Sequence, residues 1–217
     1  MNSKRRILLV DDHPLLRKGI GQLINEQPDL MVCGEAEDRA AAILEMERSQ
    51  PDLAVVDLSL KDELGLELIK DCQVRFPHVL ILVLSMFDER FYAERVLRAG
   101  VKGYIMKAEA SEKVLVAIRK VLDGGILVSS FVADQILKHI SATPKSARQD
   151  QWSALSDREI QVFALIGKGY GSQQIAERLH ISVKTIETHR ANIKQKLGIS
   201  STGDLLQSAI VYSQQAG

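Results

Sequence analysis

Five polar residues that could carry chemistry stand at the ends of short apolar segments of this chain: Asp11, Asp12, Asp57, Ser85 and Lys107. The adjacent carboxylates of Asp11 and Asp12 repel each other and are costly to remove from water, so they either face solvent or hold a cation. Three carboxylates without a soft ligand favour a hard cation, and partly hydrated Mg²⁺ is the natural occupant. With a lysine and a hydroxyl beside them, the same residues suit phosphoryl transfer onto an aspartate.

The elements that would position these residues alternate between strands and helices. Apolar runs rich in β-branched residues at 5–10, 53–56, 79–84 and 101–106, with a weaker one at 31–36, are typical of parallel strands buried on both faces. Segments with helical spacing separate them, and five repeats predict a doubly wound, flavodoxin-like (βα)5 α/β domain over residues 4–123. Ligands of such sheets bind outside the carboxyl ends of the strands, so all five side chains should meet there.

The roles of the three aspartates follow from their placement. Asp57 stands alone at the end of its strand and is the expected nucleophile, whereas Asp11 and Asp12 form the pair better suited to holding metal. Lys107 would supply a compact positive charge to the same phosphoryl group. The sequence contains no GxxxxGK[ST] loop, which indicates that the chain does not bind ATP and phosphorylate itself. The phosphoryl group must come from another molecule. Any one of these aspartates alone is more often a turn or N-cap residue, so the inference depends on their joint placement.

The rest of the chain has a different pattern. Residues 124–150 predict a linker with one short helix, because an amphipathic piece there leads into the polar stretch SATPKSARQDQ. Residues 151–217 show only helical periods and predict a small all-α domain. Ser156, with Glu159 three residues later, is a capping box that opens its first helix. Two short helices joined by a tight turn, the second at 182–197, predict a helix-turn-helix.

The helix at 182–197 is basic on its exposed side. It carries a single acid, Glu187, against four cationic residues: Lys184, Arg190, Lys194 and Lys196. A basic helix that follows a scaffold helix is the arrangement that enters the major groove of double-stranded DNA. From charge alone the competing interpretation is a solvated charged face.

The residues at the strand ends, with Tyr104 three residues before Lys107, resemble the receiver domain of bacterial two-component response regulators. The resemblance implies that a partner sensor histidine kinase phosphorylates Asp57, and that Asp11, Asp12 and Asp57 bind Mg²⁺. It also implies a switch, in which Ser85 bonds the new phosphoryl group and Tyr104 rotates inward behind it. An aromatic core residue in a buried strand is the alternative interpretation of Tyr104.

Two segments depart from the receiver pattern. Receivers commonly carry a proline four residues past the acceptor, where this chain has Lys61, followed by Asp62 and Glu63. Ala108 replaces the proline that commonly follows the lysine directly. The three charged residues near the acceptor could change the lifetime of the phosphorylated state or the choice of kinase.

A second resemblance, to the four-helix DNA-binding domain of the LuxR/FixJ/NarL type, covers nearly the whole of 153–213 and depends on LSDREIQVF and IAERLHISVKTIETHRANIKQKLGI. By position it implies base-facing and phosphate-facing residues at Lys184, Thr185, Glu187, Thr188, Arg190, Ala191 and Lys194. It also implies that the active protein is a homodimer through the last helix, at Leu205, Leu206 and Ala209. Many relatives carry lysine at the position of Glu187, and a carboxylate there would accept from cytosine N4 or repel phosphate.

Composition narrows the remaining classes of protein. The chain has 217 residues, 46% of them hydrophobic, which is ordinary for a globular protein of two domains. No apolar run approaches the ~18 residues of a membrane span, and too few apolar residues follow Lys4, Arg5 and Arg6 for a signal peptide. The two cysteines, Cys33 and Cys72, form no CxxC pair and suit a reducing cytoplasm.

With what the two resemblances imply, these observations predict a phosphorylation-regulated, DNA-binding transcription regulator of a two-component system. We expect no enzymatic activity beyond slow self-dephosphorylation. A second hypothesis is a phosphorylation-independent DNA-binding regulator whose receiver serves only as a dimerisation platform. A third is a phosphatase-like hydrolase with an aspartyl nucleophile. Such hydrolases typically place a second Asp two residues after the nucleophile, where this chain has Ser59.

Overall fold

The structure is a computed structural model that describes residues 4–60, 63–86, 89–141, 152 and 154–215. The chain divides into two compact units, residues 1–134 and 135–217, and the division falls within helix α6 (Ser130–Ser141). The polar stretch of the expected linker, 142–150, lies outside the described residues. Among the helices that the structure describes, none is both long and apolar enough to cross a membrane.

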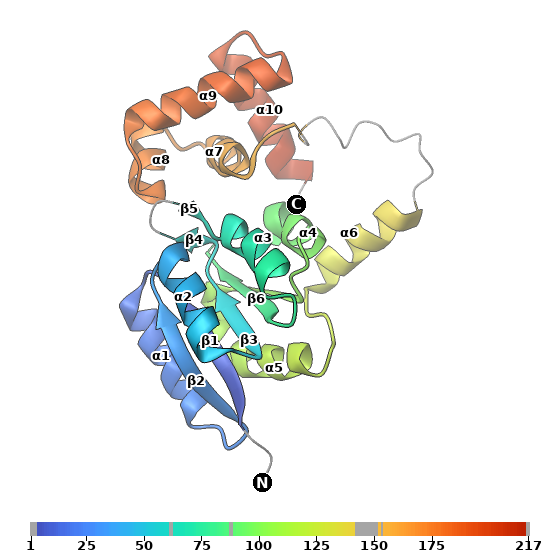
Figure 1. Ribbon diagram of the computed structural model, residues 1–217. Helices are drawn as coiled ribbons and strands as arrows, with labels where there is room; N and C mark the ends of the chain where they lie inside the picture. Colours follow the sequence, from blue (N-terminus) through green and yellow to red (C-terminus); the bar gives the residue numbers. More distant parts are fainter. Residues whose placement is uncertain (1–3, 61–62, 87–88, 142–151, 153, 216–217) are drawn as a thin grey trace. The chain divides into compact units, whose positions relative to one another are not determined.

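The first unit is built on a sheet of five parallel strands in the order β2-β1-β3-β6-β7 (Figure 1). The strands are β1 (Arg5–Val10), β2 (Leu30–Ala36), β3 (Leu53–Val56), β6 (Leu80–Ser85) and β7 (Gly103–Met106). The helices that alternate with them are α1 (Pro14–Asn25), α2 (Arg39–Ser49), α3 (Gly65–Arg75), α4 (Glu89–Arg98) and α5 (Ala110–Leu122). This order confirms the predicted doubly wound, flavodoxin-like sheet.

The central strands are buried on both faces. Ile7 and Leu9 of β1 belong to one core cluster with Leu82 and Leu84 of β6 and with residues of α1 and α5. The residues between them on the same strands, such as Leu8, point to the other face and are equally buried. The strands therefore read as continuous apolar runs, and a polar side chain can appear only where a strand ends.

Two local features of the first unit were not expected from the sequence. The loop after β3 contains a short antiparallel hairpin, β4 (Ser59–Leu60) and β5 (Glu63–Leu64). The last strand begins at Gly103 rather than at residue 101, and Leu127 adds a parallel bridge to its outer edge. The chain therefore still belongs to the sheet edge at Leu127, inside the segment expected to be a linker.

The second unit contains α7 (Asp157–Gly167), α8 (Ser172–Leu179), α9 (Val183–Leu197) and α10 (Thr202–Gln215). Its first helix begins with the predicted capping box, because Ser156 accepts from the backbone N–H of Glu159 while Glu159 accepts from that of Ser156. Ser182 caps α9 by accepting from the backbone N–H of Thr185 at 3.0 Å. His180 ends α8 in a left-handed conformation with φ 52°, which turns the chain into α9. These features confirm the all-helical domain and its helix-turn-helix.

Aromatic rings and one glycine close the core of the second unit. The ring of Trp152, the single tryptophan of the chain, lies 4.9 Å from that of Tyr212, which in turn lies 5.4 Å from that of Phe163. A Cβ atom at Gly167 would collide with the backbone carbonyl of Ala209. Glycine therefore permits the close contact between α7 and α10.

A buried carboxylate joins α7 to α9. The Glu159 side chain is only 4% exposed, and Lys196 Nζ lies 2.7 Å from its Oε2. Burial alone would raise the pKa of Glu159, but the hydrogen bonds from Lys196 and Ser156 outweigh it and hold the pKa below its ordinary value. This pair fixes the C-terminal half of α9 against α7.

We expect Lys196→Met to lower the free energy of unfolding of the second unit by about 1–2 kcal/mol at pH 7, because a buried carboxylate loses a partly solvent-screened cation. A lowered pKa means that this stabilisation is present above the ordinary carboxyl pKa of 4.5 and is lost as the pH falls through the folded value. The difference from wild type should therefore shrink below pH 4.5.

Urea unfolding of the full chain, followed by Trp152 fluorescence at pH 7 and at acid pH, measures this difference. Lys194→Met is the matched control, because within the described residues the Lys194 side chain makes no hydrogen bond or ion pair. Equal losses in the two variants would contradict a stabilising role of the Glu159–Lys196 pair.

Candidate functional site

The carboxyl ends of β1 and β3 place Asp11 and Asp57 next to each other. The backbone N–H of Asp57 donates to Val10 O at 2.8 Å, and that of Asp11 donates to Ala36 O at 3.1 Å. Each aspartate is therefore the first residue after its strand, and its backbone is still fixed by a hydrogen bond to the neighbouring strand. Their side chains are buried, with Asp57 fully enclosed.

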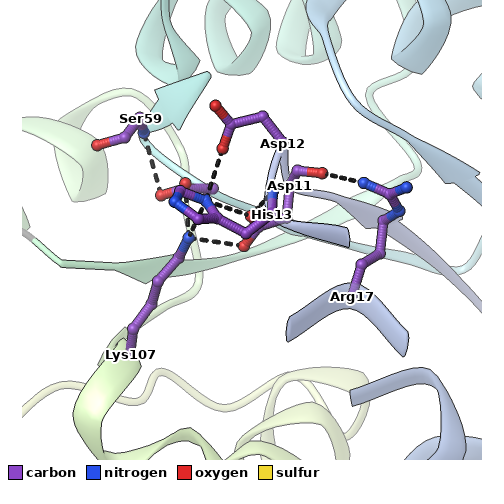
Figure 2. A network of polar contacts seen from close by, with 7 residues as sticks. Asp11, Asp12, His13, Arg17, Ser59 and Lys107 are labelled. Carbon is purple, nitrogen blue, oxygen red and sulfur yellow. Dashed lines mark hydrogen bonds and ion pairs between the residues drawn. The ribbon is translucent and has the colours of Figure 1, made fainter. Parts of the chain in front are cut away.

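Lys107 contacts both aspartates, and Figure 2 shows its side chain reaching toward Asp11. It follows β7 directly, and its Nζ is 2.7 Å from Asp11 Oδ2 and 2.7 Å from Asp57 Oδ2. Burial alone would lower the pKa of Lys107, but the carboxylates of Asp57 and Asp11 reverse the effect and raise it. One ammonium group thus compensates the two buried carboxylates. The three strand ends converge as expected from the sequence.

The Asp57 carboxylate is held at both oxygens. The backbone N–H of Ser59 donates to Oδ1 at 3.0 Å, and Lys107 Nζ donates to Oδ2. Burial raises the pKa of Asp57 above its ordinary value; Lys107 opposes this shift and Asp11 adds to it. A carboxylate that is held in one orientation and shielded from solvent is well suited to act as a nucleophile.

Asp12 and His13 complete a cluster that could hold a metal ion. One ligand atom from each of Asp11, Asp12, His13 and Asp57 lies within 4.8 Å of the others. Asp12 Oδ1 is buried and, among the described residues, no group donates a hydrogen bond to it, although His13 Nδ1 lies 2.7 Å away. Carboxylate oxygens gathered in this way are the donors that a hard divalent cation takes. The pocket of Asp11, Asp12 and Asp57 is therefore compatible with Mg²⁺.

The sequence reasoning missed three residues that shape this pocket. His13 had a signal, because it directly follows the acidic pair. Arg17 had none: it donates to the backbone carbonyl of Asp11 and, through Nε, to Glu35 at 2.8 Å, and so fixes the turn after β1. A Cβ atom at Gly65 would collide with the carbonyl of Asp57, so glycine lets the start of α3 close on the acceptor loop.

The expected switch residues are both enclosed. Ser85 ends β6 and is fully buried, and Tyr104 of β7 is 2% exposed. Tyr104 pairs with Val83 across the two strands, one residue before the pair of Ile105 with Leu84. The ring already lies inside the protein, and its rotation on phosphorylation stays a prediction. Lys61 and Asp62 lie outside the described residues, and only the backbone of Glu63 is described, in β5.

The residues expected to contact DNA share a face of α9 that solvent can reach. Ile186 and Ile193 are fully buried and fix the opposite face against the domain. Five residues of the expected set are exposed and two, Arg190 and Lys194, are partly buried: Lys184, Thr185, Glu187, Thr188, Arg190, Ala191 and Lys194. The geometry suits a recognition helix, and the individual contacts with DNA stay predictions.

Some polar side chains on the exposed face of α9 are held by hydrogen bonds or ion pairs to other described residues, and others are not. Ser172 Oγ of α8 donates to Glu187 Oε1 at 2.5 Å, and Arg190 Nε lies 3.9 Å from Glu187 Oε2. The Thr188 hydroxyl donates to the backbone carbonyl of Lys184 at 3.0 Å. Within the described residues, the ammonium groups of Lys184 and Lys194 make no hydrogen bond or ion pair. The two lysines are therefore the cations most available to phosphate.

The structure corrects part of the expected dimer surface on α10. Leu205 and Ala209 are 0% exposed, because they close the core of their own domain against α7. Of the three expected residues, Leu206 alone is exposed, at 42%. Ile210 and Val211 are each 37% exposed on the same helix. The two buried residues are not available to a second copy of the folded domain.

Comparison with known proteins assigns both units. The response regulator receiver domain family matches residues 7–119, and the luxR family of bacterial regulatory proteins matches residues 153–209. The oxygen regulatory protein NreC of Staphylococcus epidermidis is 34% identical over 210 residues, which cover 94% of this chain and 96% of that protein. NreC of Staphylococcus aureus is 36% identical over 209 residues, with the same coverage.

Solved structures agree with this assignment. The RcsB response regulator of Salmonella typhimurium is 26% identical, with a TM-score of 0.57 over 96% of this chain and 98% of that one. RcsB of Salmonella enterica bound to the promoter rprA, in the presence of the phosphomimetic BeF3⁻, has a TM-score of 0.59 at 26% identity, over 94% of this chain and 98% of that one. The chain is a receiver joined to a DNA-binding domain. It belongs to the two-component response regulators with a luxR-type helix-turn-helix output, which regulate transcription.

We expect Lys107→Met to lower the free energy of unfolding of the first unit by about 3 kcal/mol, because it leaves two buried carboxylates without their cation. Adding Asp57→Asn should recover most of this loss, since it removes one of the two repelling charges. Urea unfolding in EDTA, followed by far-ultraviolet circular dichroism, measures both effects. Lys102→Met, at an exposed position one residue before β7, is the control. A double variant no more stable than Lys107→Met would show that the two side chains are not coupled.

Proposed function

We propose that this protein is a phosphorylation-regulated transcription regulator, in which a sensor histidine kinase transfers a phosphoryl group to Asp57 and thereby controls binding of promoter DNA by α9. The observation that carries the proposal is the geometry of Asp57, a fully buried carboxylate 2.7 Å from Lys107 within a cluster of metal-ligating side chains. The fold and family place this site in a receiver. The reducing environment suggested by two unpaired cysteines supports a cytoplasmic location.

The transfer requires little of the protein beyond positioning and charge. An Asp57 oxygen attacks phosphorus as the bond from phosphorus to the imidazole nitrogen of the donor histidine breaks, and the imidazole leaves with the electron pair. The backbone N–H of Ser59 orients Asp57 Oδ1. Lys107, which contacts Oδ2, lies close enough to pair with the negatively charged phosphoryl oxygens. Asp11, Asp12 and Asp57 would hold Mg²⁺, which when bound neutralises charge on those oxygens.

Phosphorylation would change the charge balance of the pocket. A phosphoryl group adds about −1.5 to −2 charges and three strong acceptor oxygens at one point. Lys107 would then be drawn away from Asp11, and the Ser85 hydroxyl would be the nearest switch residue on the neighbouring strand end. Such a local change can be transmitted because β6 and β7 are directly paired, with the buried Tyr104 opposite Val83.

DNA binding would use the exposed face of α9. Lys184 and Lys194 would contact phosphates, and Arg190 would read or clamp the groove once released from Glu187. Glu187 is itself held by Ser172, so a carboxylate has a fixed position on the reading face, where it can accept from cytosine N4. The active form would be a homodimer, with the exposed residues of α10, including Leu206, as the contact on this unit.

The alternative of a regulator independent of phosphorylation keeps the same output domain. It is favoured by the charged residues at 61–63 near the acceptor. The alternative of an aspartyl phosphatase has less support, since Ser59 offers no carboxyl group for acid-base chemistry, and we propose that the protein has no sustained turnover. Incubation with a small phosphodonor distinguishes the three hypotheses.

Incubation with acetyl phosphate and Mg²⁺ should label the protein stoichiometrically on Asp57, and EDTA or Asp57→Asn should abolish the label. Phosphorylated protein should then bind promoter fragments more tightly than unphosphorylated protein in a footprinting titration. Labelling without any change in DNA affinity would favour the phosphorylation-independent regulator. Continuous release of inorganic phosphate over many turnovers would favour the hydrolase.

Lys194→Ala should weaken binding to all DNA sequences alike and should reduce the slope of log affinity against log salt concentration by about 1 for each protomer bound. The reason is that a phosphate contact releases counterions without reading bases. Fluorescence anisotropy of labelled duplexes between low and moderate salt measures the slope. Lys120→Ala, at an exposed position of α5, is the control. An unchanged slope in Lys194→Ala would remove this residue from the interface.

A further inference from the structure

The imidazole of His13 faces the same point as the carboxylates of the receiver pocket (Figure 2). His13 Nδ1 lies 2.7 Å from Asp12 Oδ1 and 3.1 Å from Asp11 Oδ1, and the three residues belong to the cluster that also includes Asp57. Adjacent ligands of an octahedral ion at about 2.1 Å are about 3.0 Å apart, so the spacing of these atoms suits ligands of a single ion.

Neighbouring groups of both charges surround His13 Nδ1. It lies near a carboxylate oxygen of Asp11 and one of Asp12, and 3.5 Å from the Lys107 ammonium. An imidazole nitrogen and carboxylate oxygens gathered at one point are donors that a divalent transition metal ion binds together.

The two oxygens of Asp11 have different neighbours. Oδ2 is engaged by Lys107, whereas Oδ1 is on the side of His13, where it also accepts from the backbone N–H of His13 at 2.8 Å. The His13 side chain is 56% exposed, so ligation needs no further burial and leaves the outer side of the ion open to water or a phosphoryl oxygen. His13 is the N-cap residue of α1 but its side chain makes no capping hydrogen bond, so the helix start does not engage the ring.

We propose that His13 is a protein ligand of the divalent cation in this pocket and gives the site a preference for a first-row transition metal ion such as Mn²⁺ over Mg²⁺. The proposal rests on the proposed function, because it assigns a further ligand to the same cation. Carboxylates bind Mg²⁺ and Mn²⁺ alike, whereas imidazole nitrogen binds transition metal ions and is a poor ligand for Mg²⁺. A site with both nitrogen and oxygen donors is therefore expected to bind Mn²⁺ more tightly than Mg²⁺.

The test uses the full chain and two metal ions alone, Mn²⁺ and Mg²⁺. Mn²⁺ affinity is measured from the electron paramagnetic resonance signal of free Mn²⁺, and Mg²⁺ affinity by competition. His13→Phe should weaken Mn²⁺ binding by about tenfold or more, as expected for loss of a contact that shapes a metal site, and Mg²⁺ binding by less than about threefold. Pulsed resonance should show coupling of Mn²⁺ to a nitrogen nucleus in wild type and none in His13→Phe.

His78→Phe is the matched control, because His78 is exposed and lies on the turn before β6. It should keep both affinities and the nitrogen coupling. His13→Gln, which retains a polar side chain without imidazole, should lose the nitrogen coupling as well. Asp11→Asn tests the pocket itself and should weaken both ions.

Two failures are distinguishable. If Asp11→Asn weakens both ions while wild type shows no nitrogen coupling, or His13→Phe leaves the ratio of the two affinities unchanged, the role of His13 is overturned and the acidic pocket stands. If neither ion binds, or Asp11→Asn leaves both affinities unchanged, the metal site of the proposed function fails together with this inference.

Discussion

The structure of the receiver depends on one ammonium group placed between two buried carboxylates. Lys107 lies 2.7 Å from both Asp11 and Asp57, and without it the edge of the sheet would gather carboxylates that water no longer solvates. The interaction is what allows a nucleophile to be enclosed and yet charged. It also makes the pocket responsive, because any new charge on Asp57 competes with Asp11 for the same lysine.

The second unit contains a similar pair with a different consequence. Glu159 is buried and contacts Lys196, as Asp57 contacts Lys107, but its remaining hydrogen bonds go to the Ser156 cap. No further ligand atoms gather there among the described residues, so the pair serves to hold α9. The receiver pocket instead keeps a buried oxygen of Asp12 that accepts no hydrogen bond from the described part of the chain. A gathering of ligand atoms from several residues, rather than a buried charge, separates the binding site from the scaffold.

Much of this could be predicted from the sequence, for reasons visible in particular residues. Continuous apolar runs such as Ile7 to Val10 predict strands buried on both faces, and parallel pairing then brings their ends to one edge. The capping box at Ser156 is equally local. Arg17 could not be found in this way, since its partner Glu35 is on another element. Leu205 and Ala209 share an apolar face with Leu206, and periodicity does not tell which part of that face the domain's own core uses.

The sequence by itself therefore determined the class of each domain, the order of its elements and the residues at the strand ends, because these follow from local periodicity and from the direction of parallel strands. The tertiary structure alone decided which atoms meet: that Lys107 joins Asp11 to Asp57, that His13 turns its nitrogen toward the acidic pair, and that Glu187 is held by Ser172. Such contacts depend on side-chain directions across elements distant in the chain, and no repeat or spacing in the sequence encodes those directions.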